Sequence, residues 1–525
     1  MKVHVYDTTL RDGSQGEGVS FSVEDKVKIA RRLDAFGMDY IEGGWPGAVP
    51  KDTDFFARMR SVPLRHAKLT AFGSTRRAGG TAAEDGQLRG LLDAETPVVT
   101  IVGKSWSEQV THALRVDLDE NLAMIADSVR FLKGAGREVV YDAEHFFDGY
   151  KLDPEYALRA LAAAAEAGVD VLCLCDTNGG TLPHEVFDIV SAVVARFGGV
   201  TVGMHPHDDG DCGTANALAA VRAGATHVQG TVNGYGERTG NANLIPIAAA
   251  LRLKMGYDCL SDDAMRDLTD LSTFVDEVAN MTPDPKAAYV GRNAFTHKAG
   301  LHVDAIMKGS GRMYEHLDPA RVGNVRRLLV SEQAGSATIA QKAADLGFPL
   351  DKKSPEAKAV LAEVTRRESE GYAFEGAEAS FELILKKATG RYRKLFDLVG
   401  FRVLTERRSG DDYPITEATV RLRVGSEEML TVAEGDGPVH ALDGALRSAL
   451  ARFYPELAEI RLTDFKVRVV TTGEGTAAKV RTIVESTAHG GETWSTVGVS
   501  TNIIEASWQA LVDAVEYGLL KEPKK

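Results

Sequence analysis

The segment that decides the fold is VGMHPHDD, residues 202–209, in which a short apolar run ends abruptly in histidines and aspartates. Similar runs recur along the first half of the chain, and amphipathic stretches such as Glu24–Leu33 and Pro154–Ala167 separate them. The runs are Val3–Tyr6, Tyr40–Gly43, Leu69–Phe72, Val98–Val102, Val139–Asp142, Val171–Cys175, Val202–His205 and Val228–Val232. Strands that alternate with helices at this spacing predict parallel βαβ units. Eight units within about 240 residues favour a closed (β/α)8 TIM barrel over an open doubly wound sheet.

Beyond the predicted barrel the pattern of the sequence changes twice. Residues 266–400 are mostly helical in pattern and include the charged stretch Ser354–Glu370. From residue 401 the order strand, strand, glycine turn, helix occurs twice, and the two helices are Val439–Ala451 and Ile503–Tyr517. Such self-similarity indicates an internal repeat. We therefore predict a TIM-barrel catalytic domain over residues 1–265, helical linker subdomains over 266–400, and an α+β C-terminal domain with an internal repeat over 401–525.

Composition excludes several classes of protein. The chain has 525 residues, and 61 Lys and Arg against 75 Asp and Glu give a net charge of −14, so a nucleic-acid-binding protein is not expected. No apolar run approaches the roughly 18 residues of a membrane span, and no signal-peptide pattern opens the sequence. The four cysteines do not form a disulfide framework, and we interpret Cys173 and Cys175 as buried small residues. We expect a cytoplasmic protein.

Polar side chains collect where the predicted strands end. Barrel active sites are built at the carboxyl ends of their strands. Arg11 and Asp12 follow the first strand, and five further strand ends carry Glu42, Glu144 with His145, Asp176–Asn178, His205–Asp209 and Asn233–Asn241. This consistent placement predicts an active site.

A divalent metal ion is predicted in this site. His205 and His207 are two residues apart, so on a strand both point to the same face. Asp12 is the natural carboxylate partner, and imidazole with carboxylate suits Mg²⁺ or Mn²⁺, with Zn²⁺ also possible. The alternative is a pair of hydrogen-bonded histidines in a polar loop. Arg11 beside the cation would stabilise negative charge on a substrate oxygen, or form an ion pair with Asp12 or Glu144.

Several motifs resemble the α-isopropylmalate synthase, homocitrate synthase and citramalate synthase family. DTTLRDGSQ at residues 7–15 is similar to the first family signature and NGYGERTGN at 233–241 to the second. HKAGLH at 297–302 together with Tyr314 resembles the segment after the barrel. GDGPV at 435–439 and GVSTNIIEA at 498–506 resemble the family's effector-binding domain.

The resemblance implies a Claisen condensation that uses acetyl-CoA as co-substrate. Asp12, His205 and His207 would hold the cation, with Asn241 at or near it. Arg11 and Thr177 would bind the 2-oxo acid, and Glu144 would assist removal of a proton from the acetyl methyl group. The implied catalytic set also includes His302 and Tyr314, which reach the neighbouring subunit's site in the family. A homodimer is implied, with isoleucine as the effector of the C-terminal domain.

The choice of 2-oxo acid stays open between branches of the family. EGGWPGAVPKD at residues 42–52 and CDTNGGT at 175–181 resemble the citramalate synthase branch, which uses pyruvate. The alternatives are a 2-isopropylmalate or homocitrate synthase acting on a larger 2-oxo acid, a metal-dependent hydroxyacyl-CoA lyase, and a non-catalytic amino-acid-binding protein. Two positions depart from the family pattern: Asp208 replaces the usual asparagine, which could alter metal preference, and Thr239 stands where many members have cysteine.

Overall fold

The computed structural model describes residues 1–297, 306, 309, 311–328, 336–407, 413–470, 475–488 and 493–521. The chain divides into two compact units. The first unit comprises Met1–Phe295 and Leu317–Val325, and the second comprises Thr296–His316 and Arg326–Lys525. None of the helices in the described ranges combines the length and apolarity that crossing a bilayer requires.

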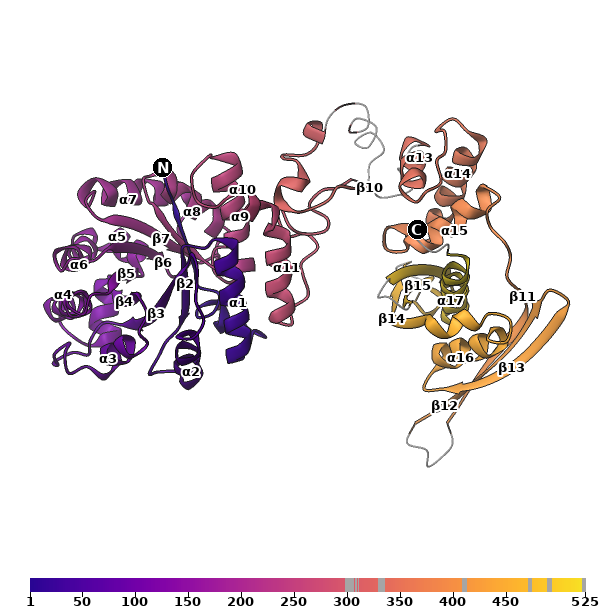
Figure 1. Ribbon diagram of the computed structural model, residues 1–525, viewed down its shortest axis with the longest axis horizontal. Coiled ribbons are helices and arrows are strands. Elements are labelled where there is room, and N and C mark those ends of the chain that lie inside the picture. The colour runs from indigo at the N-terminus through magenta and orange to yellow at the C-terminus, as the bar shows by residue number, and fades with distance from the viewer. Residues whose placement is uncertain are drawn as a thin grey trace. The chain divides into compact units, whose positions relative to one another are not determined.

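The first unit contains a closed barrel of eight parallel strands, as the sequence predicts. Each predicted run overlaps one strand, and helices surround the barrel (Figure 1). The strands are β1 (His4–Asp7), β2 (Tyr40–Gly44), β3 (Lys68–Ser74), β4 (Val98–Lys104), β5 (Glu138–Glu144), β6 (Val171–Asp176), β7 (Thr201–Pro206) and β8 (His227–Gly230). The helices are α1 (Val23–Phe36), α2 (Pro50–Met59), α3 (Gly86–Asp93), α4 (Leu118–Gly134), α5 (Phe146–Leu152), α6 (Pro154–Glu166), α7 (Pro183–Arg196), α8 (Gly213–Arg222), α9 (Leu244–Ala249), α10 (Asp262–Arg266) and α11 (Leu268–Val278).

Local sequence signals set the ends of these elements. Ser22 caps the start of helix α1: its hydroxyl accepts from the Asp25 amide, and the Asp25 carboxylate accepts from the Ser22 amide. This reciprocal cap satisfies two amides that the first turn leaves without helical partners. The helix ends at Gly37, whose φ of 101° lies in the left-handed region that glycine adopts without strain.

Side chains fill the barrel interior, so it is a packed core. The rings of Tyr6, Tyr40 and His227 lie within 5.2–5.6 Å of one another between centroids. All six residues of β6 are buried, as expected for a parallel strand covered on both faces. The polar residues at the strand ends therefore stand on a rigid base.

The second unit holds most of the predicted helical region and the C-terminal domain, whereas helix α11 belongs to the first unit. Its short strands β9 (Thr296–His297) and β10 (Arg327–Leu328) pair in parallel. The helices α13 (Ser336–Asp345), α14 (Pro355–Ser369) and α15 (Glu378–Ala388) follow. The C-terminal part contains β11 (Asp397–Glu406), β12 (Ile415–Val424), β13 (Glu427–Gly435), α16 (Pro438–Leu450), β14 (Arg461–Val469), β15 (Val480–Thr487), β16 (Thr493–Ser500) and α17 (Ile503–Leu520).

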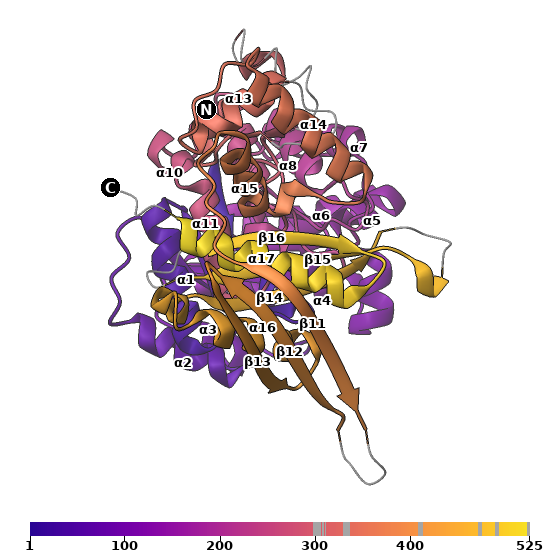
Figure 2. The same ribbon diagram turned by 90° about the vertical axis from the view of Figure 1, so that its right-hand side faces the viewer.

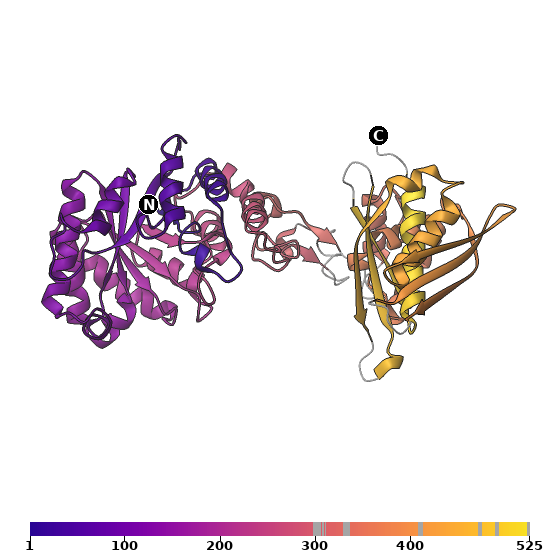
Figure 3. The ribbon, with the colours of Figure 1, turned by 90° about the horizontal axis from the view of Figure 1, so that it is seen from below.

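The internal repeat predicted for the C-terminal part is present, and each copy has one more strand than expected. Each copy is a three-stranded antiparallel sheet followed by a helix, with β11 and β14 as the additional strands (Figure 2). Helix α16 packs on β12 and β13, helix α17 packs on β15 and β16, and the two helices contact each other. The helices thus lie between the two sheets (Figure 3).

Candidate functional site

The three predicted metal ligands come together at the carboxyl end of the barrel. Asp12 follows β1, His205 lies in β7 and His207 follows the end of that strand. One ligand atom from each residue lies within 4.8 Å of the other two, and all three residues are buried. His205 Nε2 is 3.3 Å from Asp12 Oδ2. The structure thus brings together the residues that the sequence proposes as ligands.

Asn241 adds an oxygen to this set. His207 and Asn241 pair as an isolated antiparallel β-bridge, which brings the loop after β8 to the end of β7. The Asn241 amide nitrogen donates to the carbonyl of Tyr235 at 3.1 Å. Within the described residues, His207 Nδ1 and Asn241 Oδ1 are buried and have no hydrogen-bond partner. Such orphaned acceptors are costly unless a ligand satisfies them, so the donor set fits a divalent cation.

The electrostatics of the ligand set agree with cation binding. Burial alone raises the pKa of Asp12, but the Arg11 guanidinium and His205 lower it far below its usual value, so Asp12 stays ionised. Burial and the nearby His205 together lower the pKa of His207 to about 4, so its imidazole is neutral. Burial lowers the pKa of His205, yet the hydrogen bond to Asp12 raises it overall, to about 10. A bound cation would displace that proton, since metal binding competes with protons for ligand atoms.

The glycine-rich loop after β8 holds Asn241 in place. Asn233 donates to Asp276 at 2.6 Å and accepts from Ser272 at 2.7 Å, and these contacts fix the start of the loop on α11. The loop then folds back tightly, because a Cβ on Gly240 would lie 1.9 Å from the carbonyl oxygen of Gly234. The second signature is therefore a rigid turn that requires glycine for close backbone approach.

Arg11 is held beside the ligands by contacts on three sides. Its Nε donates to Glu42 at 2.5 Å, and its Nη2 lies 3.4 Å from Asp12. Its Cζ lies 3.7 Å from the centroid of the Phe72 ring. Tyr6 donates to the other oxygen of Glu42 at 2.5 Å, so Glu42 is itself fixed. The ion pair predicted between Arg11 and Asp12 is present, and Glu42 rather than Glu144 is the second carboxylate.

Glu144 and Thr177 lie on neighbouring strand ends. Glu144 ends β5, is one quarter exposed and forms an ion pair with Lys104, which ends β4. The Thr177 hydroxyl accepts from the His145 amide at 2.9 Å, so the loops after β5 and β6 are joined. None of the described residues accepts the Thr177 hydroxyl proton, which leaves it available for a substrate.

The structure shows the surroundings of the two positions that depart from the family pattern. Asp208 Oδ1 accepts from the amide of Gly213 at 2.6 Å, at the first turn of α8. Asp208 therefore satisfies a backbone amide at the start of this helix and is not in the group of candidate ligands. Thr239 is exposed in the glycine-rich loop.

The other two proposed catalytic residues come after the barrel in the chain. His302 lies outside the described residues. Tyr314 belongs to the second unit, and its side chain is exposed.

Two buried polar residues behind the ligands were not singled out from the sequence. Gln229 in β8 accepts from His205 Nδ1 at 2.7 Å, and its amide nitrogen donates to Asp142 in β5 at 3.1 Å. Asp142 could have been found from the alternation of side chains along a strand. It lies two residues before Glu144 and so points to the same side of β5.

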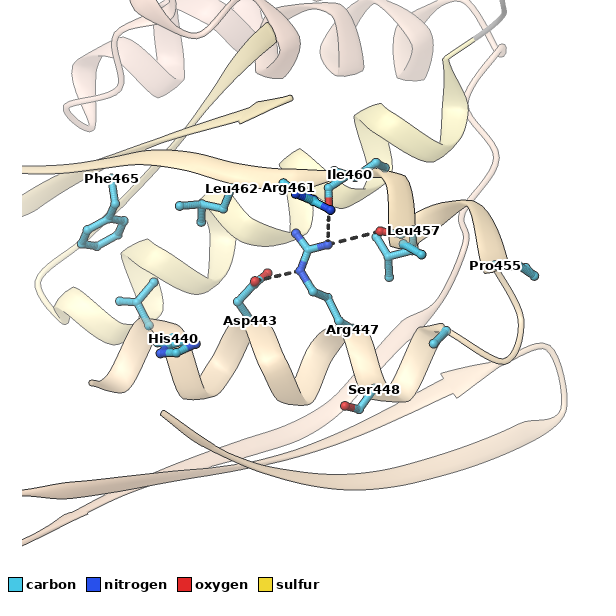
Figure 4. Close-up of a pocket in the computed structure, with 13 residues that line it drawn as sticks. His440, Asp443, Arg447, Ser448, Pro455, Leu457, Ile460, Arg461, Leu462 and Phe465 are labelled. Atoms are coloured by element: carbon cyan, nitrogen blue, oxygen red, sulfur yellow. Dashed lines mark hydrogen bonds and ion pairs between the residues drawn. The ribbon is translucent and has the colours of Figure 1, made fainter. Parts of the chain in front are cut away.

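A cavity of about 890 Å³ lies in the second unit between α16, the short helix η8 (Pro455–Glu459) and the start of β14 (Figure 4). Its lining is largely apolar and includes Val439, Leu457, Ile460, Leu462 and Phe465. Arg447 donates to Asp443 at 2.7 Å and to the carbonyl of Ile460 at 2.6 Å. Asp443 Oδ1 is buried and without a partner among the described residues. The cavity thus combines an apolar wall with an unsatisfied carboxylate oxygen.

Family comparisons match the chain in three consecutive parts. The HMGL-like family matches residues 2–275, the homocitrate synthase post-HMGL domain-like family residues 289–370, and the LeuA allosteric (dimerisation) domain residues 375–519. These matches cover the barrel, the helical region and the repeated C-terminal part.

Proteins that are similar to this chain along its full length indicate the same family. An (R)-citramalate synthase of Aquifex aeolicus is 52% identical and covers 100% of this chain and 99% of its own. That of Geobacter sulfurreducens is 51% identical and covers 99% and 98%. A 2-isopropylmalate synthase of Pyrococcus furiosus is 28% identical and covers 98% of both chains. The chain therefore belongs to the (R)-citramalate synthase family, with an HMGL-like barrel followed by a LeuA allosteric (dimerisation) domain.

Proposed function

We propose that the chain condenses acetyl-CoA with pyruvate and hydrolyses the thioester to give (R)-citramalate and CoA, in isoleucine biosynthesis. The observation that carries the proposal is the cluster of Asp12, His205, His207 and the orphaned Asn241 oxygen beside Arg11. The higher identity to citramalate synthases supports pyruvate over the larger 2-oxo acid of the 2-isopropylmalate synthase.

The cation is the cofactor of this reaction. A divalent ion held by Asp12, His205 and His207, with Asn241 alongside, would polarise the carbonyl of the 2-oxo acid. Arg11 then faces the carbonyl oxygen. Because Glu42 and Phe72 hold its guanidinium in place, it stabilises the developing negative charge without reorganising.

Glu144 and Thr177 act on the two substrates. Thr177 donates its hydroxyl proton to the carboxylate of pyruvate. The Glu144 carboxylate accepts a proton from the acetyl methyl group, and the ammonium of Lys104 keeps the carboxylate oriented beside it. The carbanion formed in this way attacks the carbonyl carbon of pyruvate.

A homodimer completes the site in this proposal. His302 and Tyr314 would reach the active site of the neighbouring subunit. The match to a dimerisation domain supports this arrangement, as do exposed apolar side chains that alternate with charged ones on the outer face of the β11–β13 sheet. That face carries Leu404, Ile415, Leu430 and Val432, each more than half exposed. Exposed apolar patches of this kind are typical of protein interfaces.

We assign the effector, isoleucine, to the cavity of Figure 4. Its apolar wall suits an aliphatic side chain, and the unsatisfied Asp443 Oδ1 suits the ammonium group of an amino acid. In this proposal, residues 1–265 form the catalytic domain and residues 266–400 link it to the C-terminal domain. Residues 401–525 bind the effector and form the dimer. A cytoplasmic location is part of the same proposal, because the substrates are metabolic intermediates.

The metal site is tested by His207→Ala, with the exposed His184→Ala as its matched control. We expect His207→Ala to lose bound Mn²⁺ and CoA release while its circular dichroism spectrum stays that of the wild type. The control keeps both. A folded His207→Ala protein that binds Mn²⁺ and turns over normally would remove the basis of the proposal.

A further inference from the structure

Behind the ligand His205 lies a chain of buried polar side chains that the proposed reaction does not use. His205, Gln229 and Asp142 come from β7, β8 and β5, and none is more than 4% exposed. Their hydrogen bonds run in sequence from the imidazole to the amide and from the amide to the carboxylate. A buried polar chain of this kind is expected to have a role, because leaving any of its members unpaired is costly.

The direction of each hydrogen bond follows from the chemistry of the acceptors. The Gln229 amide nitrogen lies 3.1 Å from Asp142 Oδ1. When Asp142 is ionised, the opposite orientation of the amide would place its oxygen against a carboxylate oxygen, which is repulsive. The amide oxygen therefore faces His205 Nδ1 at 2.7 Å, and the proton of that bond must reside on Nδ1. His205 Nε2, the atom nearest Asp12, is thereby left to bind the cation.

We propose that Gln229 and Asp142 are positioning residues that fix the tautomer and ring orientation of His205 for metal binding. This inference rests on the proposed metal site. Outer partners of metal-bound histidines fix the tautomer and raise the basicity of the ligand, and their loss typically costs about 10–100-fold in metal affinity.

The role requires only that Asp142 present an acceptor oxygen. Burial raises the pKa of Asp142 to about 7, so the neutral and the ionised form are both accessible near neutral pH. Either form accepts from Gln229 through one oxygen. An asparagine at position 142 keeps such an oxygen, whereas a leucine does not.

The test measures Mn²⁺ affinity by electron paramagnetic resonance on the purified full-length protein. We expect Gln229→Leu and Asp142→Leu to weaken Mn²⁺ binding about 10–100-fold, and Asp142→Asn to stay within about threefold of the wild type. Thr100→Val is the matched control: Thr100 is equally buried and bonds to Tyr6 rather than to a ligand, so affinity should be unchanged.

The outcomes separate this inference from the proposed function. If the wild type binds no Mn²⁺, or binds it equally well with His207→Ala, the metal site itself is wrong. If wild type and His207→Ala behave as expected but folded Gln229→Leu binds as tightly as the wild type, only the positioning role is overturned. Should Gln229→Leu fail to fold, the Asp142 pair decides: equal affinity of Asp142→Asn and Asp142→Leu contradicts the inference.

Discussion

The guanidinium of Arg11 lies over the ring of Phe72, with its Cζ 3.7 Å from the ring centroid, while its Nε donates to Glu42. The ring contact and the hydrogen bond together hold the guanidinium in place. Arginine is suited to this role because its fork keeps donors for a substrate oxygen after Glu42 has taken one.

Arg11→Lys keeps the charge but loses the planar fork. Lysine cannot both hold Glu42 and stack on Phe72, so the ammonium would leave the substrate oxygen. We expect kcat to fall about 100- to 1000-fold, the effect of removing one preorganised donor. Steady-state CoA release measures this loss, and an activity within about threefold of the wild type would contradict the role of Arg11.

Glu144→Gln removes the proposed proton acceptor with little change in shape. We expect kcat to fall about 100- to 10,000-fold with little change in thermal stability. The exposed Glu155→Gln is the control and should leave turnover unaltered. Exchange of the acetyl methyl hydrogens into deuterated water isolates the step, and undiminished exchange by Glu144→Gln would assign proton removal to another residue.

Asp208→Asn restores the residue usual in the family. Because Asp208 Oδ1 accepts from the Gly213 amide and lies outside the ligand group, asparagine should preserve both this hydrogen bond and the metal preference. Asp208→Ala removes the acceptor and should cost about 1 kcal/mol of unfolding free energy. Urea denaturation and the ratio of Mg²⁺- to Mn²⁺-supported activity check this. A changed metal ratio in Asp208→Asn would show that the carboxylate acts on the cation.

The barrel and most of its site could be predicted from the sequence because they rest on short-range patterns. Strand runs such as Val171–Cys175 are buried on both faces and read as continuous apolar segments. His205 and His207 point to the same side because side chains alternate along a strand. They lie close to Asp12 because closure of the barrel brings the strand ends together.

Other features depend on long-range contacts that no local pattern reveals. The bond between Gln229 and Asp142 joins residues 87 apart, and Glu42 rather than Glu144 pairs with Arg11. The sequence suggests that the Asp208 carboxylate could alter metal preference, but it does not reveal that this carboxylate turns to the start of α8. The strands β11 and β14 were missed because their residues are mostly exposed, which weakens the period-two signal.

The effector cavity is best tested by point variants. Helix α15 packs on β16, so a truncation near residue 400 would remove β16 and expose the buried side of α15. Asp443→Asn removes the charge that would pair with the ammonium group, and Leu462→Trp fills the apolar wall. We expect the half-inhibitory isoleucine concentration to rise about tenfold or more, in line with loss of a charge-assisted hydrogen bond. Inhibition curves for CoA release measure it, and unchanged curves in both variants would place the effector elsewhere.

The choice of 2-oxo acid separates citramalate synthesis from the other condensations of this family. CoA release from acetyl-CoA is measured with free-thiol detection in the presence of Mn²⁺, with pyruvate, 2-oxoisovalerate and 2-oxoglutarate offered in parallel. We predict a kcat/KM for pyruvate at least about tenfold above those of the other two, as expected when one pocket discriminates by a few methylene groups. Equal or faster CoA release with 2-oxoisovalerate or 2-oxoglutarate would contradict the assignment to citramalate synthesis.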